Sequence, residues 1–367
     1  MKKKKLQNDA RGARKCSVGC VIRRCLLVLL TTLLAVAALA FCALKMICSD
    51  ISVSAKQMFV TTLLETGQLK FLASWFVDDD EITALVNSNS MRPMEQTIDD
   101  SKITIDRTGV EVQNSSEEKG NIEIVEVPGK TFYGTLMIVH DPASVRLATI
   151  YPWRDEGETL DSIVKSSGAV AGINGGLYQS YNNSGGAPYG VVVSGGEIQN
   201  NDPQGFPGLV LIGLTEDDIL QIVDMSDMTP QDVENMVAEK KIRDAVTFQE
   251  EASDRNNHFV QLIINGQPRE MSGMGSGLNP RTAIGQRADG SLLLLVTDGR
   301  GSSGHLGASA SDLIDVMMQY GAVNAANLDG GSSSCMYYED AYLMTSVTFY
   351  YSNSSWKLPF AFVVDRK

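Results

Sequence analysis

The sequence predicts an α+β protein: a domain with a mixed β-sheet and flanking helices, preceded by one transmembrane helix. Two observations predict this fold class. A long apolar run without charge lies near the N-terminus, and from about residue 122 short strand patterns, glycine turns and a few helical patterns intermix without a regular strand–helix alternation. The chain therefore divides into a basic cytoplasmic tail (1–24), a transmembrane helix (25–44), a juxtamembrane helical stalk and linker (45–121) and a folded domain (122–367).

The apolar run covers Cys25–Leu44, twenty residues with no charged side chain. At a rise of about 1.5 Å per residue, such a helix spans about 30 Å, the thickness of a bilayer core. Nine Lys and Arg residues precede it and only Asp9 opposes them. The positive-inside rule then predicts a single-pass protein of the cell membrane, with a cytoplasmic N-terminus and an extracytoplasmic domain. Cleavage as a signal peptide stays open, because Ala38-Leu39-Ala40 offers a small-x-small site.

Charge and cysteine content restrict the function of the domain. All but one of the 44 acidic residues follow residue 48, whereas ten of the 31 basic residues precede it. So acidic a domain argues against a nucleic acid partner, and contact with a phosphorylated polymer requires a few well-placed arginines. Cys335 is the only cysteine beyond residue 48, so no disulfide can form within the domain, and we interpret this thiol as a small buried residue.

The segment between the anchor and the domain has two parts that differ in composition and in the spacing of apolar residues. Residues 49–90 carry apolar side chains at helical spacing, which predicts a stalk of one or two helices. Residues 91–121 are polar and lack core periodicity, which predicts a mobile linker. A fragment that starts near residue 122 is therefore expected to fold alone.

Turn and capping signals define elements within the domain. Helix starts are predicted at Thr229-Pro230 and at Ser309-x-x-Asp312, where a hydroxyl can cap the first turn. Three pairs of apolar runs predict hairpins: Thr135–His140 with Val145–Ile150, Gly208–Leu214 with Ile219–Val223, and Thr282–Gln286 with Leu292–Thr297.

Three clusters of small and polar residues directly follow or begin apolar strands. A buried strand fixes the backbone and aims the polar side chain at its end, and an adjacent glycine leaves room for a ligand. Taken singly, each cluster is more typical of an ordinary turn, but three together indicate a site. The clusters are Ala171–Tyr178, Asn279–Gly285 with its hairpin partner Leu293–Arg300, and Asn324–Ser334.

The chemistry of these clusters points to phosphate and sugar. Arg281 and Arg300 suit bidentate recognition of a phosphate or carboxylate. Asp298 and Asp329 suit carboxylate catalysis of glycoside cleavage. His305 follows a Gly-Ser-Ser-Gly loop and is interpreted as a surface histidine.

Four stretches within these clusters resemble the motifs of the phosphodiester glycosidase family, in the family's order: Gly172–Tyr178, Asn279–Gly285, Asp298–Arg300 and Asn327–Ser333. The resemblance covers about residues 130–367. The family includes a lysosomal enzyme that removes N-acetylglucosamine from a mannose 6-phosphate diester. Gly330-Gly331-Ser332 departs from the pattern, since members often carry a third glycine there. The resemblance implies a membrane-anchored hydrolase that cleaves the sugar–phosphate bond of a sugar-1-phosphodiester in cell-surface glycan or exopolysaccharide metabolism.

The resemblance also implies roles for residues. Arg281, Asp298 and Asp329 are expected to be catalytic. Whether a calcium or magnesium ion assists stays open, since the two aspartates offer oxygen ligands, and no cofactor is implied as required. The residues expected to bind substrate are Asn174, Gly175, Gly176, Tyr178, Thr282, Arg300, Asn327, Gly330, Gly331 and Ser332.

A non-catalytic module that binds a glycan or phosphorylated glycan polymer of the cell envelope is the rival hypothesis. It would need the same arginines and asparagines but no pair of carboxylates. The paired aspartates favour the enzyme.

Overall fold

The computed structural model describes residues 18–66, 70–105, 120–252, 257–347 and 353–366. The chain forms two compact units that divide between Lys56 and Gln57. The first contains α1 (Val18–Ile47), a 30-residue helix with no buried residue that is long and apolar enough to cross a membrane. Its length and composition fit either a single-pass anchor or a signal sequence.

The residues predicted to form a stalk carry α2 (Val53–Leu64), which crosses the division between units, α3 (Phe71–Phe76) and α4 (Asp79–Ser88). In the predicted linker, Asp100–Lys102 form a 3-10 turn, and residues 106–119 lie outside the described residues. The described part of this segment differs from a free stalk, because it contacts the domain. The buried amide of Asn89 donates to the carbonyl of Ser276 (3.1 Å), and the N–H of Thr104 donates to the carbonyl of Ala288 (2.8 Å).

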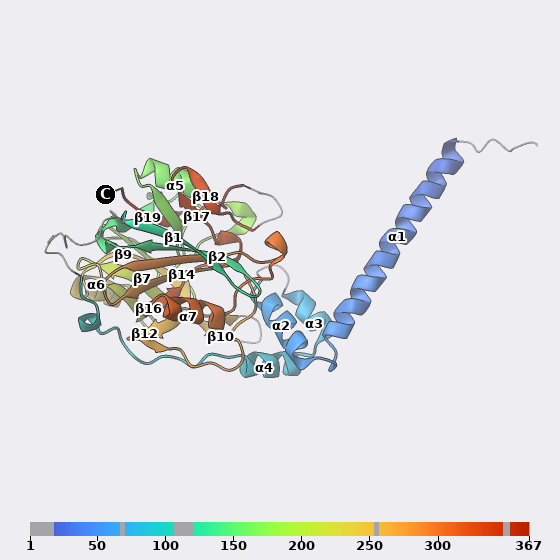
Figure 1. The fold of residues 1–367 in the computed structure, drawn as a ribbon, viewed down its shortest axis with the longest axis horizontal. Helices are drawn as coiled ribbons and strands as arrows, with labels where there is room; N and C mark the ends of the chain where they lie inside the picture. Colours follow the sequence, from blue (N-terminus) through green and yellow to red (C-terminus); the bar gives the residue numbers. More distant parts are fainter. Residues whose placement is uncertain (1–17, 67–69, 106–119, 253–256, 348–352, 367) are drawn as a thin grey trace, which may run out of the picture. The chain divides into compact units, whose positions relative to one another are not determined.

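The domain is a mixed helix-and-sheet fold built from antiparallel sheets (Figure 1). Its seven-stranded sheet has the order β1-β2-β15-β14-β16-β12-β13, and its two five-stranded sheets have the orders β18-β17-β4-β19-β3 and β6-β5-β9-β7-β8. A two-stranded ribbon, β10-β11, completes the set of described sheets.

The strands of the seven-stranded sheet are β1 (Ile122–Pro128), β2 (Tyr133–Val139), β12 (Gln261–Ile264), β13 (Gln267–Pro268), β14 (Arg281–Arg287), β15 (Leu292–Thr297) and β16 (Ala322–Asn327). The first five-stranded sheet contains β3 (Val145–Thr149), β4 (Ala171–Asn174), β17 (Met336–Tyr338), β18 (Ala341–Met344) and β19 (Phe360–Val364). The second contains β5 (Val191–Ser194), β6 (Glu197–Asn201), β7 (Leu209–Thr215), β8 (Leu220–Asp224) and β9 (Ile242–Gln249). The ribbon strands are Glu251–Ala252 and Asn257–His258, and the helices are α5 (Leu160–Ser166), α6 (Pro230–Glu239) and α7 (Ala310–Gln319).

The core lies on both faces of the central strands. Along β15, Leu294 joins the cluster shared with the five-stranded sheets, and Leu293 joins the cluster under α7. Because side chains alternate along a strand, a strand buried on both faces reads as a continuous apolar run. The tetraleucine of β15 is such a run.

Two predicted hairpins are confirmed, β14 with β15 and β7 with β8. The hairpin predicted around Asp141-Pro142 is wrong, because β2 pairs with β1 and β15 whereas β3 pairs with β19 in another sheet. Both predicted helix starts are confirmed as capping boxes, Thr229 with Asp232 and Ser309 with Asp312.

Candidate functional site

Three strand ends meet at one end of the seven-stranded sheet. β14 begins at Arg281 and runs antiparallel to both neighbours, so Arg281 pairs with Thr297 of β15 and Ala283 pairs with Asn327 of β16. The polar residues that follow β15 and β16 therefore lie beside those that begin β14. β4, from another sheet, joins them through the side chain of Asn174. Tertiary structure thus brings the three clusters together.

Asn174 fixes the loop that carries Asp329. Its Nδ2 donates to the carbonyl oxygen of Asp329 (2.7 Å), and its Oδ1 accepts from the hydroxyl of Thr282 (2.8 Å) and the N–H of Cys335 (3.2 Å). The N–H of Asp329 in turn donates to the carbonyl of Gly175 (3.1 Å). Asn174 and Thr282 are fully buried, so these bonds orient Asp329.

Asp329 is half-buried among groups that tune its carboxyl. Burial raises its pKa from 3.8 to about 7, although the Ser333 hydroxyl, the Gly330 N–H and the Arg300 charge act in the opposite direction. The hydroxyl of Tyr178 lies 2.9 Å from Ser333 Oγ, and burial together with Asp329 raises the pKa of that phenol. A carboxyl that titrates near neutrality is suited to proton exchange.

Arg300 reaches across the glycines of the same loop and stays accessible to solvent. Its Nη1 donates to Ser332 Oγ (2.9 Å) and its Nε to Asn279 Oδ1 (3.3 Å). The residue is exposed, but desolvation by the protein groups around the guanidinium lowers its pKa, and the nearby charge of Arg281 lowers it further. A Cβ at Gly331 would lie 2.7 Å from Arg300 Nη2, so glycine leaves the room that the arginine occupies.

Arg281 is buried, with 6% of its surface exposed. Its Nε donates to the carbonyl of Ala308 (3.2 Å), and its Nη2 donates to the carboxylate of Glu65, the carbonyl of Gly277 (2.8 Å) and Ser276 Oγ (3.2 Å). The first arginine expected to bind phosphate is therefore bound to protein groups, and the second, Arg300, is the accessible one.

Glu65 directly follows α2 and sends its carboxylate into this cluster. Its side chain is 2% exposed. Oε1 accepts from the N–H of Gly277 (2.6 Å), and Oε2 accepts from Asn279 Nδ2 (3.1 Å) as well as from Arg281. The segment next to the candidate anchor thus contributes a buried charge to the site.

Asp298 and Asp329 face different groups. Asp298 Oδ1 accepts from the N–H of Tyr133 in β2 (2.7 Å), and Oδ2 lies 2.7 Å from His305 Nδ1. Asp329, which follows β16, interacts with the Ser333 hydroxyl and the Arg300 charge. His305 is therefore held by a carboxylate, although its side chain remains 33% exposed. No local pattern in the sequence indicated that Asp298 and His305 are partners.

Other residues expected to bind substrate pack against protein groups. Asn327 is buried and its Nδ2 donates to the carbonyl of Phe259 (2.9 Å). A Cβ at Gly175 would lie 2.8 Å from the ring of Phe360, and one at Gly176 would lie 2.2 Å from a backbone oxygen of β9. Close packing therefore requires both glycines.

Sequence reasoning missed Glu65 and the roles of Asn279 and Ser333. Asn279 and Ser333 lie within the polar clusters identified from the sequence, so their position in these clusters was a signal that could have identified them. Glu65 lies in a helical pattern without any local signal, because its partners are more than 200 positions away. The described part of the chain holds no group of three or more His, Cys, Asp or Glu side chains suited to a metal ion.

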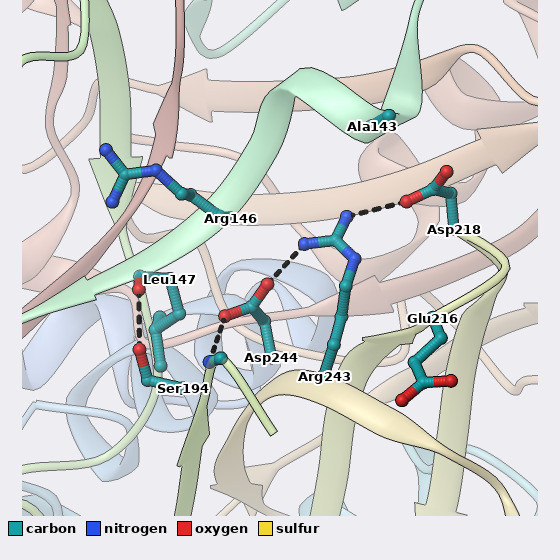
Figure 2. A pocket seen from close by; sticks show the side chains of 9 residues that line it. Ala143, Arg146, Leu147, Ser194, Glu216, Asp218, Arg243 and Asp244 are labelled. Atoms are coloured by element: carbon teal, nitrogen blue, oxygen red, sulfur yellow. Dashed lines mark hydrogen bonds and ion pairs between the residues drawn. The ribbon is translucent and has the colours of Figure 1, made fainter. Parts of the chain in front are cut away.

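A pocket of about 560 Å³ lies elsewhere in the domain (Figure 2). Figure 2 shows Arg243 between Asp244 and Asp218, with Nη2 3.0 Å from the Asp218 carboxylate. Arg243 is therefore paired with two carboxylates, and the pocket shares no residue with the cluster of Arg300 and Asp329. Its lining residues are Ala143, Arg146, Leu147, Ser194, Gly195, Glu216, Asp218, Arg243 and Asp244.

Fold and site together define an α+β domain with a polar carboxyl–arginine cluster where antiparallel strands end. The sequence model of the phosphodiester glycosidase family matches residues 167–365, more than half of the chain. The chain belongs to this family.

Three relatives illustrate the similarity. Over 192 residues the chain is 27% identical to an uncharacterized protein, YomE, derived from the SPbeta prophage of Bacillus subtilis (strain 168); the match covers 51% of this chain and only 27% of that protein. The zebrafish N-acetylglucosamine-1-phosphodiester alpha-N-acetylglucosaminidase catalytic domain, auto-inhibited by pro-peptide, has a TM-score of 0.51 at 17% identity, covering 69% of this chain and 86% of that one. A hypothetical protein from Synechocystis has a TM-score of 0.42 at 17% identity, covering 67% and 62%.

Proposed function

We propose that the domain hydrolyses a sugar-1-phosphodiester at the bond between the anomeric carbon and the phosphate oxygen. The observation that supports this most is the arrangement of Asp329, a carboxyl whose pKa is raised to about 7, beside the charge of Arg300, an exposed residue. Family membership supports a glycosidase, and the pairing of an anion-binding arginine with a carboxyl supports a substrate that carries phosphate on its sugar.

The proposed reaction assigns one task to each group. The leaving group is a phosphate monoester, a weak base that needs little protonation, so Arg300 stabilises its negative charge directly. Asp329, in its ionised form, accepts the proton of the water that attacks the anomeric carbon. Asn174, itself bound by Thr282, orients Asp329 through its backbone carbonyl. Asp298 orients His305 at the edge of the site.

The same proposal includes the location of the domain and the source of its substrate. With α1 retained as a single-pass anchor and the basic tail in the cytoplasm, the domain lies outside the cell membrane. Its substrate is then a phosphodiester-linked sugar of a cell-surface glycan or exopolysaccharide.

The test is turnover by the purified full-length chain in detergent. The chain is incubated with a panel of sugar-1-phosphodiesters, and released sugar and phosphate monoester are measured separately. Equal amounts of both are expected, and Asp329→Asn should lower the release of both by roughly a hundredfold to ten thousandfold. Asp217→Asn makes the same chemical change on an exposed turn and should leave turnover intact. If the wild type binds these compounds but releases no sugar, the domain is a binding module and the proposed reaction is refuted.

A further inference from the structure

The contact between Glu65 and the site is anchored at several points. Thr62, in the last turn of α2, accepts the N–H of Leu278 on its hydroxyl (3.0 Å). The backbones also approach closely, since a Cβ at Gly277 would lie 2.4 Å from the nitrogen of Thr62. Asn89 binds the same loop from α4, through the N–H of Met274 (2.8 Å). These contacts make the end of α2 an integral wall of the site.

Glu65 also decides which way the amide of Asn279 points. A carboxylate can only accept hydrogen bonds, so it attracts the Nδ2 end of Asn279. The Oδ1 end then faces Arg300 and accepts from its Nε. A relay of three side chains, Glu65–Asn279–Arg300, thus joins the segment after the candidate anchor to the accessible guanidinium.

The Glu65 carboxylate also provides the counter-charge of Arg281. Arg281 is buried and close enough to Arg300 to lower the pKa of that guanidinium, while the charge of Glu65 acts in the opposite direction. The same charge of Arg281, with Lys70 and above all burial, lowers the pKa of His258 to about 4. A buried arginine without a counter-charge is strongly destabilising. Glu65 neutralises it and leaves Arg300 as the accessible positive charge.

We propose that Glu65 is a positioning residue of the site: it neutralises Arg281 and, through Asn279, holds Arg300 where the phosphate of the substrate binds. This rests on the proposed function for the identity of the substrate. The anion site itself is independent of turnover, because Arg300 would bind inorganic phosphate whether or not a glycosidic bond is cleaved.

The experiment compares Glu65→Gln, Arg281→Gln and the double variant in the full-length chain. Each single variant leaves one buried charge unpaired and should unfold at lower temperature, whereas the double variant carries a neutral pair and should regain stability. Glutamine can donate as well as accept, so Asn279 is no longer oriented in the double variant. Its affinity for inorganic phosphate should therefore stay about 10- to 100-fold below wild type, with a matching rise in KM and a smaller fall in kcat. Glu95→Gln, an exposed carboxylate of the same segment, is the matched control.

Three outcomes overturn the inference. If the double variant recovers both stability and phosphate affinity, Glu65 has only a structural role. If Glu65→Gln raises turnover, the segment is an inhibitory cover. If wild type and Arg300→Gln bind inorganic phosphate equally, Arg300 is not the anion site. A wild type that binds phosphate through Arg300 but cleaves no phosphodiester would refute the proposed reaction and leave the positioning role standing.

Discussion

At the scale of single residues, the site depends on how burial acts on two arginines and two aspartates. Arg281 and Arg300 lie close together, yet one is buried against Glu65 and the other is accessible. Asp298 is bound by Tyr133 and His305, whereas burial raises the pKa of Asp329 to about 7. Two residues of the same type therefore differ in exposure or in the groups that bind them, and their surroundings in the fold cause this difference.

The pH dependence of turnover should follow Asp329. If the ionised carboxylate accepts the proton from water, kcat/KM rises as the pH increases through about 7, because the fraction of ionised Asp329 rises there. Asp329→Asn should remove this rise and lower the rate by roughly a hundredfold to ten thousandfold. Initial rates between pH 5 and 9 measure both effects. A rate that instead falls through pH 7 would mean that the protonated carboxyl is the active form.

The stability of the chain should respond to the same carboxyl. The folded chain retains a proton on Asp329 between about pH 4 and 7 that the unfolded chain has released, so this group favours folding at low pH and that contribution is lost as the pH rises through about 7. At pH 8 the ionised group is destabilising, and neutral Asp329→Asn should be more stable than wild type by about 1–3 kcal/mol. Urea unfolding at pH 8 and pH 4.5 tests this, and a similar difference at both values would contradict it.

At the scale of elements, the junction between α2 and the loop before β14 controls the site. The loop has no regular structure of its own, so its shape depends on the bonds from Thr62, Glu65 and Asn89. The strand ends are rigid by comparison, because β14 is paired on both sides. Changes at this junction should therefore move Asn279 and Arg300 without disturbing the sheet.

Gly277→Ala tests the junction. The added Cβ would lie 2.4 Å from the nitrogen of Thr62 and 2.7 Å from the carbonyl carbon of Thr61, so α2 must shift. We expect a loss of about 1–3 kcal/mol in the free energy of unfolding and a clear fall in turnover. Gly120→Ala is the control, since its nearest neighbour, an oxygen of Ile122, lies 4.0 Å away. Equal stability of the two variants would show that α2 is not packed as described.

At the scale of the whole molecule, the chain joins a candidate membrane helix to a folded unit that already begins at Gln57. The segment after the helix carries buried apolar side chains, such as Val60, Leu64 and Val86, and supplies a buried charge to the site. The domain therefore has no clean boundary at residue 122.

Truncation should reveal this dependence. A fragment of residues 57–367 should unfold in one cooperative transition, unaffected by reductant because Cys335 is its only cysteine. A fragment of residues 122–367 lacks Glu65 and leaves Arg281 buried without its counter-charge, which costs about 3–5 kcal/mol. Circular dichroism melts compare the two. Equal melting temperatures would show that the sheets are stable without the helices.

Membrane topology is the second prediction at this scale. The uncharged run of Cys25–Leu44 behind a basic tail predicts a retained anchor with the domain outside. Protease treatment of intact cells should release a soluble fragment that begins after residue 48. Sequencing the N-terminus of the membrane-bound protein provides the check, and a mature end near Phe41 would establish signal peptide cleavage.

Features that depend on local chemistry could be predicted from the amino-acid sequence alone. The apolar run, the capping hydroxyls of Thr229 and Ser309, and the hairpin between β14 and β15 follow from side chains a few positions apart. The three polar clusters were also visible, because glycine and polar residues at the end of an apolar strand form a local pattern. What each cluster member contacts was not visible.

The partners that these residues contact depend on the fold and could not be predicted from the sequence. The turn at Asp141-Pro142 allows either a hairpin or a crossing to another sheet. The chain crosses here because β1 and β15 already pair with the two edges of β2. Glu65 meets Arg281 across more than 200 positions, and the same fold leaves Arg300 accessible. Burial and long-range contact set the charge state and reach of a side chain, and neither is encoded within a few neighbouring residues.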